Sequence, residues 1–399
     1  MNKRIVVFLV AIYFACSALS FGIFHFAFAS GVVKPVVGGG LAGLISPAVP
    51  GASGGVGVNA ALPKTEACPL NGELYTVPEK QAWEKRRPLA VMIENHPDAR
   101  PQSGLTSADV VYEGMAEGGI TRFEAIFLCG AQAKDTIVAP VRSARQQFVE
   151  IASEYNYPLY AHVGGSNGTD TDPRVRALEH LSDYGWTGYN DLNQFSIGYP
   201  VFVRNYNRIP GKDLATEHTM EASTNRLWNY AASNRKLTNL DKTGADWLKG
   251  FVKWDFADDA AAGERAASQK VDYGFWQGQT DFDVTWQYDA STNLYKRSLA
   301  GQPHIDINNQ QQIAAKNVVV LFTVEQGPLD IHKHIYDKIA GGAGKALIFQ
   351  NGKEIVGTWS KKDRVSRTIF LDNKGKPVKF VRGQIWVSVL ANDTPVTVN

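Results

Sequence analysis

The chain lacks an excess of charge of either sign, since 41 basic residues face 39 acidic ones and the formal net charge is only +2. It also lacks a dense run of Lys and Arg, so it has none of the basic stripes that bind nucleic acid, and we expect no such partner. The hydrophobic share of 44% and the charged share of 20% are ordinary for globular proteins. A chain of 399 residues with this composition can bury a sizeable core and can form two domains.

Motifs for cofactors and covalent catalysis are scarce as well. No Gly-x-Ser-x-Gly elbow is present, and the glycines at 38–40 and 54–55 are not framed by a strand and a helix as a phosphate loop would be. His332 and His334 could share one face of a strand, but no third metal ligand suggests itself. We therefore expect no cofactor and no metal site, and enzymatic activity is the weaker interpretation.

Residues 1–29 have the pattern of a membrane-targeting segment. Lys3 and Arg4 precede an apolar run over residues 5–29, and a positive start of this kind stays in the cytoplasm while the remainder goes outward. The run is long enough to cross a bilayer, which takes about 20 residues, so it predicts an uncleaved signal anchor.

Two other interpretations of this segment stay open. Ala27-Phe28-Ala29 fits a cleavage site, which would release a secreted protein beginning at Ser30. Cys16 could serve a lipoprotein signal, but the apolar run continues well past it. All three interpretations place the rest of the chain outside, on the extracytoplasmic face of the cytoplasmic membrane or in the medium.

Residues 30–67 are rich in Gly, Ala and Pro and nearly free of charge, so they predict a disordered linker. Cys68 and Cys129 are the two cysteines of the exported part. In an oxidising compartment such a pair predicts a disulfide, with two free thiols as the alternative.

The exported body should be α+β and consist of two parts. Residues 68–245 predict a mixed α/β domain, with strands near 88–93, 109–112, 123–128 and 159–163 and helices near 143–155, 173–181 and 216–232. Residues 250–395 predict a mostly β domain, in which Asn351-Gly352 signals a hairpin.

Several segments, in the same order, resemble the YerB-like lipoprotein family. They are residues 87–104 (RPLAVMIENHPDARPQSG), 108–113, 117–123 and 140–145 (PVRSAR), and in the second part 301–304, 315–320, 344–349 and 357–359. The resemblance covers about residues 68–395 and implies an envelope-associated protein with a two-part domain of unknown function. It supplies no catalytic residues. Members often carry a lipobox, and this sequence departs from that pattern.

The densest polar group opens the helix predicted at 143–155. A helix N-terminus attracts anions, and the guanidiniums of Arg142 and Arg145 beside it could hold a carboxylate, phosphate or sulfate. Polar residues after neighbouring strands should gather at the same cleft. The predicted ligand-binding cleft is lined by Asn95, His96, Arg142, Ser143, Arg145, His162 and Ser166. Alternatively, the two arginines pair internally with Glu113, Glu117 or Glu124.

We therefore interpret the chain as a membrane-tethered cell-envelope protein and, more specifically, as a non-catalytic binding or accessory factor. Its expected partners are the membrane, and a cell-wall glycan or peptide or an envelope protein. The alternative is an envelope hydrolase that uses two of Asp109, Glu113, Glu117 and Glu124, or Ser143 with His162 or His218. A purely structural docking protein is the third interpretation.

Overall fold

The computed structural model describes residues 62–399, which belong to one compact unit. The predicted targeting segment and most of the predicted linker lie outside the described residues. Within residues 62–399, no helix is both long enough and apolar enough to cross a membrane.

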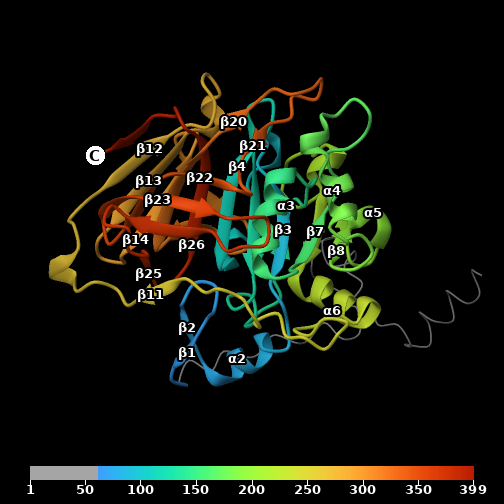
Figure 1. The fold of residues 1–399 in the computed structure, drawn as a ribbon, viewed down its shortest axis with the longest axis horizontal. Helices are drawn as coiled ribbons and strands as arrows, with labels where there is room; N and C mark the ends of the chain where they lie inside the picture. The colour runs from blue at the N-terminus through green and yellow to red at the C-terminus, as the bar shows by residue number, and fades with distance from the viewer. Residues whose placement is uncertain (1–61) are drawn as a thin grey trace, which may run out of the picture. The chain divides into compact units, whose positions relative to one another are not determined.

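A ten-stranded mixed sheet runs through the whole of this unit, in the order β24-β23-β22-β19-β26-β4-β5-β3-β7-β8 (Figure 1). Its first-half strands are β3 (Leu89–Glu94), β4 (Val110–Glu117), β5 (Ile120–Phe127), β7 (Leu159–His162) and β8 (Asp191–Asn193). Its second-half strands are β19 (Asn317–Thr323), β22 (Gly342–Gln350), β23 (Lys353–Lys361), β24 (Ile369–Asp372) and β26 (Ile385–Ala391). The parallel pair β4–β26 joins the two halves, so both predicted parts of the body contribute to one sheet.

The central strands form where the sequence is apolar on both faces. All six residues of β3 and all seven of β19 are buried, as expected for strands covered on both sides. Alternate residues of β3 enter two different cores: Leu89, Val91 and Ile93 lie in one, Ala90 and Met92 in the other.

A smaller antiparallel sheet covers one of these cores. It contains β12 (Lys270–Tyr273), β13 (Val284–Asp289), β14 (Leu294–Leu299), β15 (Gln302–Pro303) and β27 (Val396–Val398), and β18 (Ala314–Ala315) pairs with β14. Trp286 of this sheet packs edge-on against Trp386 of the large sheet, with ring centroids 5.4 Å apart. The second half of the body is therefore mostly β, as predicted.

Helices belong mainly to the first half, and α4, α5 and α6 gather near the β7–β8 edge of the large sheet (Figure 1). The helices are α2 (Val77–Trp83), α3 (Gln146–Ala152), α4 (Ala177–Asp183), α5 (Gln194–Ile197) and α6 (Thr224–Arg235). The remaining short strands are β1 (Glu66–Ala67), β2 (Leu74–Tyr75), β6 (Ile137–Val138), β9 (Val203–Arg204), β10 (Met220–Ser223), β11 (Asp255–Ala257), β16 (Ile305–Asp306), β17 (Gln311–Gln312), β20 (Glu325–Gln326), β21 (Tyr336–Asp337) and β25 (Lys379–Val381). The α+β fold class is confirmed.

Two predicted helices need correction. The helix expected at 216–232 is wrong in its first half, because residues Met220–Ser223 form β10, which pairs with both β6 and β9. The helix begins only after Ser223, whose hydroxyl accepts a hydrogen bond from the Arg226 N–H as an N-cap. The helix expected at 143–155 is shorter than predicted: α3 begins at Gln146 and gives way to a 3₁₀ turn, η4 (Ser153–Tyr155).

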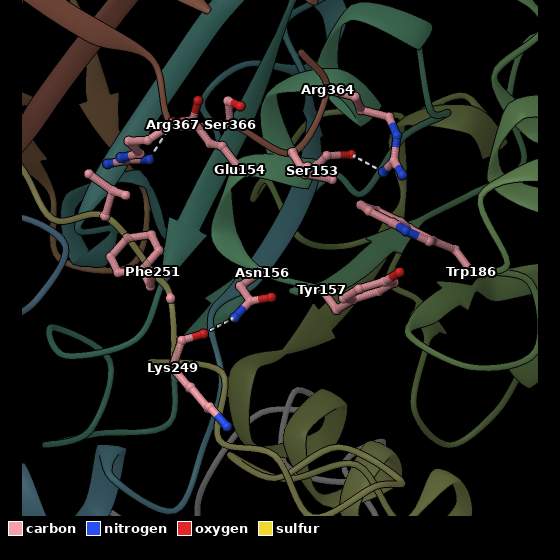
Figure 2. Close-up of a pocket in the computed structure, with 13 residues that line it drawn as sticks. Ser153, Glu154, Asn156, Tyr157, Trp186, Lys249, Phe251, Arg364, Ser366 and Arg367 are labelled. Atoms are coloured by element: carbon pink, nitrogen blue, oxygen red, sulfur yellow. Dashed lines mark hydrogen bonds and ion pairs between the residues drawn. The ribbon is translucent and has the colours of Figure 1, made fainter. Parts of the chain in front are cut away.

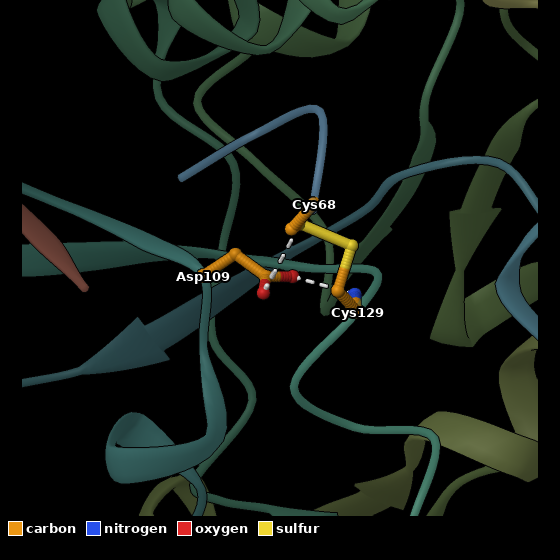
Figure 3. A group of neighbouring side chains, drawn as sticks. All are labelled: Cys68, Asp109 and Cys129. Carbon is orange, nitrogen blue, oxygen red and sulfur yellow. Dashed lines mark hydrogen bonds between the residues drawn. A yellow bond between two sulfur atoms is a disulfide. The ribbon is translucent and has the colours of Figure 1, made fainter. Parts of the chain in front are cut away.

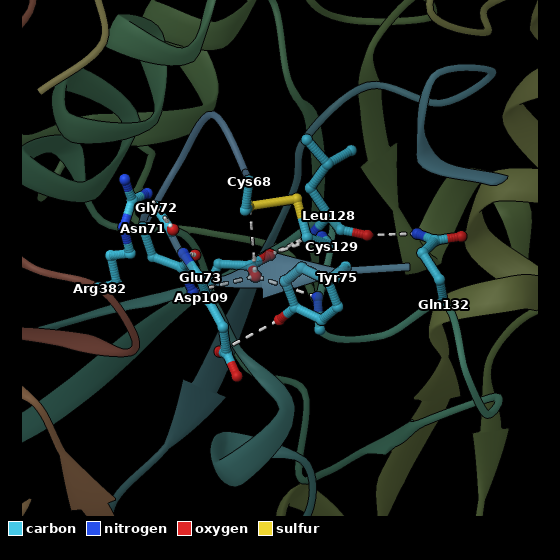
Figure 4. The surroundings of a disulfide bond; sticks show 11 residues. Cys68, Asn71, Gly72, Glu73, Tyr75, Asp109, Leu128, Cys129, Gln132 and Arg382 are labelled. Atoms are coloured by element: carbon cyan, nitrogen blue, oxygen red, sulfur yellow. Dashed lines mark hydrogen bonds between the residues drawn. A yellow bond between two sulfur atoms is a disulfide. The ribbon is translucent and has the colours of Figure 1, made fainter. Parts of the chain in front are cut away.

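The predicted disulfide is present between Cys68 and Cys129, and it ties the beginning of the body to the end of β5 (Figure 4). The buried carboxylate of Asp109 lies beside it and accepts hydrogen bonds from the backbone N–H groups of Leu128, Cys129 and Gly130. These contacts hold the chain that follows β5 in place, so the disulfide and Asp109 both stabilise this part of the fold.

Candidate functional site

Asn95 and His162 of the predicted cleft are buried and bonded within the fold. Asn95 donates to the Thr121 hydroxyl at 2.7 Å, and its own oxygen accepts from Arg100 and Gln102. His162 is fully buried, with its two ring nitrogens 2.7 Å from the Gly164 carbonyl and 2.7 Å from Asp191. These side chains position loops and do not line an open cleft.

Ser166 has the same kind of role. Its hydroxyl donates to the Val175 carbonyl and accepts from the Ala177 N–H at 3.2 Å. It is buried, and it fixes the turn that leads into α4.

Arg145 follows the internal-pairing alternative. Its guanidinium lies 2.7 Å from the Glu117 carboxylate, which also binds Arg122 at 2.9 Å. Burial alone would raise the pKa of Glu117, but the two arginines lower it to about 2. Arg145 therefore holds β4 to the start of α3, and its charge is already compensated by a carboxylate.

Arg142 and Ser143 do line an open pocket. Its volume is about 400 Å³, and its other lining residues include Leu178, Phe195, Arg204 and Glu217. Arg142 is partly exposed, and its Nε donates to Glu94 at 3.1 Å. Arg204 enters from β9 and donates from one terminal nitrogen to the Thr216 carbonyl at 2.6 Å. Two guanidiniums and one carboxylate thus surround the opening.

Glu94 at the end of β3 organises the polar groups behind this pocket. One of its oxygens accepts from Arg142, and the other lies 2.9 Å from Nδ1 of His218. Burial would raise the pKa of Glu94, but His218 and Arg142 lower it below its ordinary value. The ring of His96, the last residue of the predicted cleft, stacks on His218 with centroids 5.1 Å apart.

The acidic residues of the alternative hydrolase do not form an open pair. Glu113 is fully buried and lies 2.6 Å from Arg297, and Glu124 is fully buried, which raises its pKa well above the ordinary value. Neither these two nor Asp109 and Glu117 are among the residues that line the pocket at Arg142. The arrangement offers no glycosidase-like pair of carboxylates at that opening.

Sequence reasoning missed Arg297, Arg204 and the role of Glu94. Alternation within β14, where Tyr295 and Leu299 point inward and Arg297 occupies the inward position between them, is a signal that could have shown Arg297 to be buried. Arg204 carries no such signal, since β9 is only two residues long and half-exposed.

Among the described residues, two groups have metal-ligand side chains close together. In the first, Cys68 and Cys129 are joined by the disulfide beside Asp109, so they offer no thiolates (Figure 3). The second contains His96, Asp98 and His218. Its two rings stack at 16° and Nδ1 of His96 accepts from the Asp98 N–H, a poor geometry for directing two imidazoles at one ion.

Comparisons with known proteins agree with the family resemblance. Residues 75–236 match the family model described as "Protein of unknown function (DUF3048) N-terminal domain", and residues 271–387 match the corresponding C-terminal domain. A Bacillus subtilis (strain 168) protein named "Putative lipoprotein YerB" is 29% identical over 336 residues, which cover 83% of this chain and 88% of that protein. The crystal structure of YerB from Bacillus subtilis superposes with a TM-score of 0.64 at 26% identity, covering 84% of this chain and all of that one.

Proposed function

The chain belongs to the DUF3048 family, and from this premise we propose that it is an extracytoplasmic, membrane-tethered envelope protein that binds an anionic envelope ligand beside Arg142. The relative named as a lipoprotein supports a position at the outer face of a membrane. The apolar run at residues 5–29 supports the same position, because it follows the basic start expected of an anchor. The disulfide fits an oxidising compartment.

The pocket at Arg142 is the observation that carries the binding role. Two arginines and a single acid, Glu217, line it, so positive side chains outnumber negative ones in the lining. Glu94 holds Nε of Arg142, and this bond positions the guanidinium at the pocket wall. A positioned guanidinium binds carboxylates and phosphates with directed hydrogen bonds.

Capture of soluble cell-wall fragments by the purified full chain tests this role. Because Arg145 is paired with Glu117 inside the fold, the informative variant combines Arg142→Ala with Arg204→Ala. It should capture clearly less than the wild type, because charge-assisted hydrogen bonds to an anion are removed. Its melting temperature should fall only modestly, because the buried Glu94 loses Arg142 but keeps its contact with His218.

Lys374→Ala is the matched control, since this lysine is exposed in a turn distant in sequence from the pocket residues. It should capture fragments as the wild type does. Equal capture by the double variant and the wild type would show that the Arg142 pocket is not the binding site.

A further inference from the structure

A second and larger pocket lies where the two family segments meet the chain that connects them. Its volume is about 560 Å³, within the range of about 300–1,000 Å³ typical of small-molecule sites. The first segment contributes residues from 153–157, the connecting chain residues from 249–252 and the second segment residues from 364–367 (Figure 2). It shares no lining residue with the Arg142 pocket.

Positive charge predominates in its lining. Lys249, Arg364 and Arg367 face a single acidic residue, Glu154. That carboxylate is buried and already binds two cations, Arg367 and, from behind the pocket, Lys361 at 3.1 Å. One carboxylate therefore serves two buried cations, and the two cations at the rim have no acidic partner in the lining.

The side chain of Arg367 packs against aromatic rings at the wall of this pocket. Its guanidinium lies 3.6 Å from the ring centroid of Trp254 and 4.6 Å from that of Tyr155. It is buried, yet its Nε and one terminal nitrogen have no hydrogen-bond partner within residues 62–399. Such nitrogens usually find an acceptor, so this charge is held by aromatic rings and is incompletely hydrogen-bonded.

Arg364 is held at the rim in a fixed orientation. Its guanidinium stacks 3.9 Å from the ring centroid of Tyr184, and one terminal nitrogen donates to the Ser153 hydroxyl at 2.9 Å. Lys249 is exposed across the opening, where Asn156 donates a hydrogen bond to its backbone carbonyl at 3.1 Å. Hydrogen bonds between lining residues therefore hold both of the chain segments that carry these cations.

Aromatic rings complete the pocket. Figure 2 shows Tyr157 and Trp186 on the side opposite Phe251 and Arg367. The Tyr157 side chain is 43% exposed, and Nε1 of the buried Trp186 has no hydrogen-bond partner among the described residues. Ring faces beside hydrogen-bonding groups suit a ligand with one apolar face and a polar edge.

From these features we propose that this pocket binds an acidic sugar, a pyranose ring that carries a carboxylate or a phosphate. The ring lies against Tyr157 and Phe251, and the acidic group lies between Lys249 and Arg364. Neither an inorganic anion nor a neutral sugar would use every feature of the pocket. An inorganic anion would make no contact with the aromatic rings, and a neutral sugar would leave Lys249 and Arg364 without a negatively charged partner. The inference is independent of the proposed role of the Arg142 pocket.

Isothermal titration of the full chain with paired sugars tests the proposal. N-acetylmuramic acid and N-acetylglucosamine share a ring and differ by a carboxylate-bearing group, and glucose 6-phosphate and glucose differ by a phosphate. We expect at least one acidic sugar to bind at least tenfold more tightly than its neutral partner and than inorganic phosphate. Comparing the two acidic sugars with each other also shows whether the pocket prefers a carboxylate or a phosphate. Equal binding within both pairs, equal binding of inorganic phosphate, or no binding of either acidic sugar would overturn the proposal.

Variants assign the binding to this pocket. Lys249→Ala combined with Arg364→Ala should weaken binding of the acidic sugar at least tenfold, while Lys374→Ala should leave it unchanged. Lys249→Ala alone removes only an exposed side chain. It should weaken binding without lowering the melting temperature, and so it separates a loss of binding from a loss of folding in the double variant. If the Arg142→Ala variant alone lost binding, the sugar would occupy the other pocket and the proposal would fail.

Discussion

Glu154 offers the sharpest test of how the two halves of the body hold together. Its carboxylate, in η4 of the first half, accepts from Thr368 N–H at 3.0 Å and Thr368 Oγ1 at 2.6 Å, and it pairs with Lys361 and Arg367. These three partners belong to the second half, and the Tyr112 hydroxyl of the first half also donates to the carboxylate at 3.0 Å. Replacing Glu154 with Gln keeps the shape of the side chain but removes its charge, leaving two buried cations without their shared carboxylate.

The size of the effect follows from the pKa. Burial would raise the pKa of Glu154, but Arg367 and Lys361 lower it from 4.5 to about 2. Because this folded-state pKa is depressed, the stabilisation is fully present above pH 4.5 and is lost as the pH falls toward 2. The shift corresponds to about 3 kcal/mol at pH 7, similar to the roughly 3–5 kcal/mol lost when a buried ion pair is broken.

Urea denaturation followed by tryptophan fluorescence measures this loss. Glu154→Gln should lower the free energy of unfolding by about 3 kcal/mol at pH 7 but by only about 2 kcal/mol at pH 3.5. Glu179→Gln is the matched control, since it removes a half-exposed surface partner of Arg176 and should cost less than about 1 kcal/mol. A loss below 1 kcal/mol for Glu154→Gln at pH 7, or a loss that does not shrink in acid, would refute the reasoning.

Two further predictions concern stability. Reducing the Cys68–Cys129 disulfide, which closes a loop with a sequence separation of 61, should lower the free energy of unfolding by about 4 kcal/mol in denaturation with and without reductant. The Cys68→Ser, Cys129→Ser double variant should be insensitive to reductant, and sensitivity there would contradict the assignment. Burial and Asp393 raise the pKa of Glu325 from 4.5 to about 7, so wild-type stability should fall as the pH rises from 4.5 through 7. Glu325→Gln should therefore be stabilised relative to wild type at pH 8 and not at pH 4, and an equal effect at both would contradict this.

Local patterns in the sequence were sufficient to predict the main strands and the disulfide pair. The apolar run at 88–93 became β3, and Asn351-Gly352 became the turn between β22 and β23, with φ angles of 55° and 71° at its two residues. Such features depend on neighbours in the chain. The strand β10 was missed because its pairing partners, β6 and β9, are short and carry no clear periodicity of their own.

The candidate site was harder to predict because its side chains are distributed by long-range contacts. His162 was predicted to line a cleft, but its ring is hydrogen-bonded to Asp191, which lies 29 residues further along the chain. Arg142 and Arg145 lie only three residues apart, yet Arg145 is buried against Glu117 while Arg142 reaches an opening. Both arginines are paired with a carboxylate, and only the fold determines which of them also lines a pocket.

Charge at the junction of the two halves connects the fold with the proposed second site. A buried ion pair adds little net stability, but leaving one partner unpaired is costly, so Glu113–Arg297 and Glu154–Arg367 disfavour any other arrangement of the halves. Lys361 shares the Glu154 carboxylate with Arg367, so the junction retains an excess of positive charge on the wall of the 560 Å³ pocket. An anionic ligand there would lie between Lys249 and Arg364, the two rim cations that have no acidic partner in the lining. Because the contacts that align the halves use the one carboxylate of the lining, they leave the rim cations free to favour an acidic ligand.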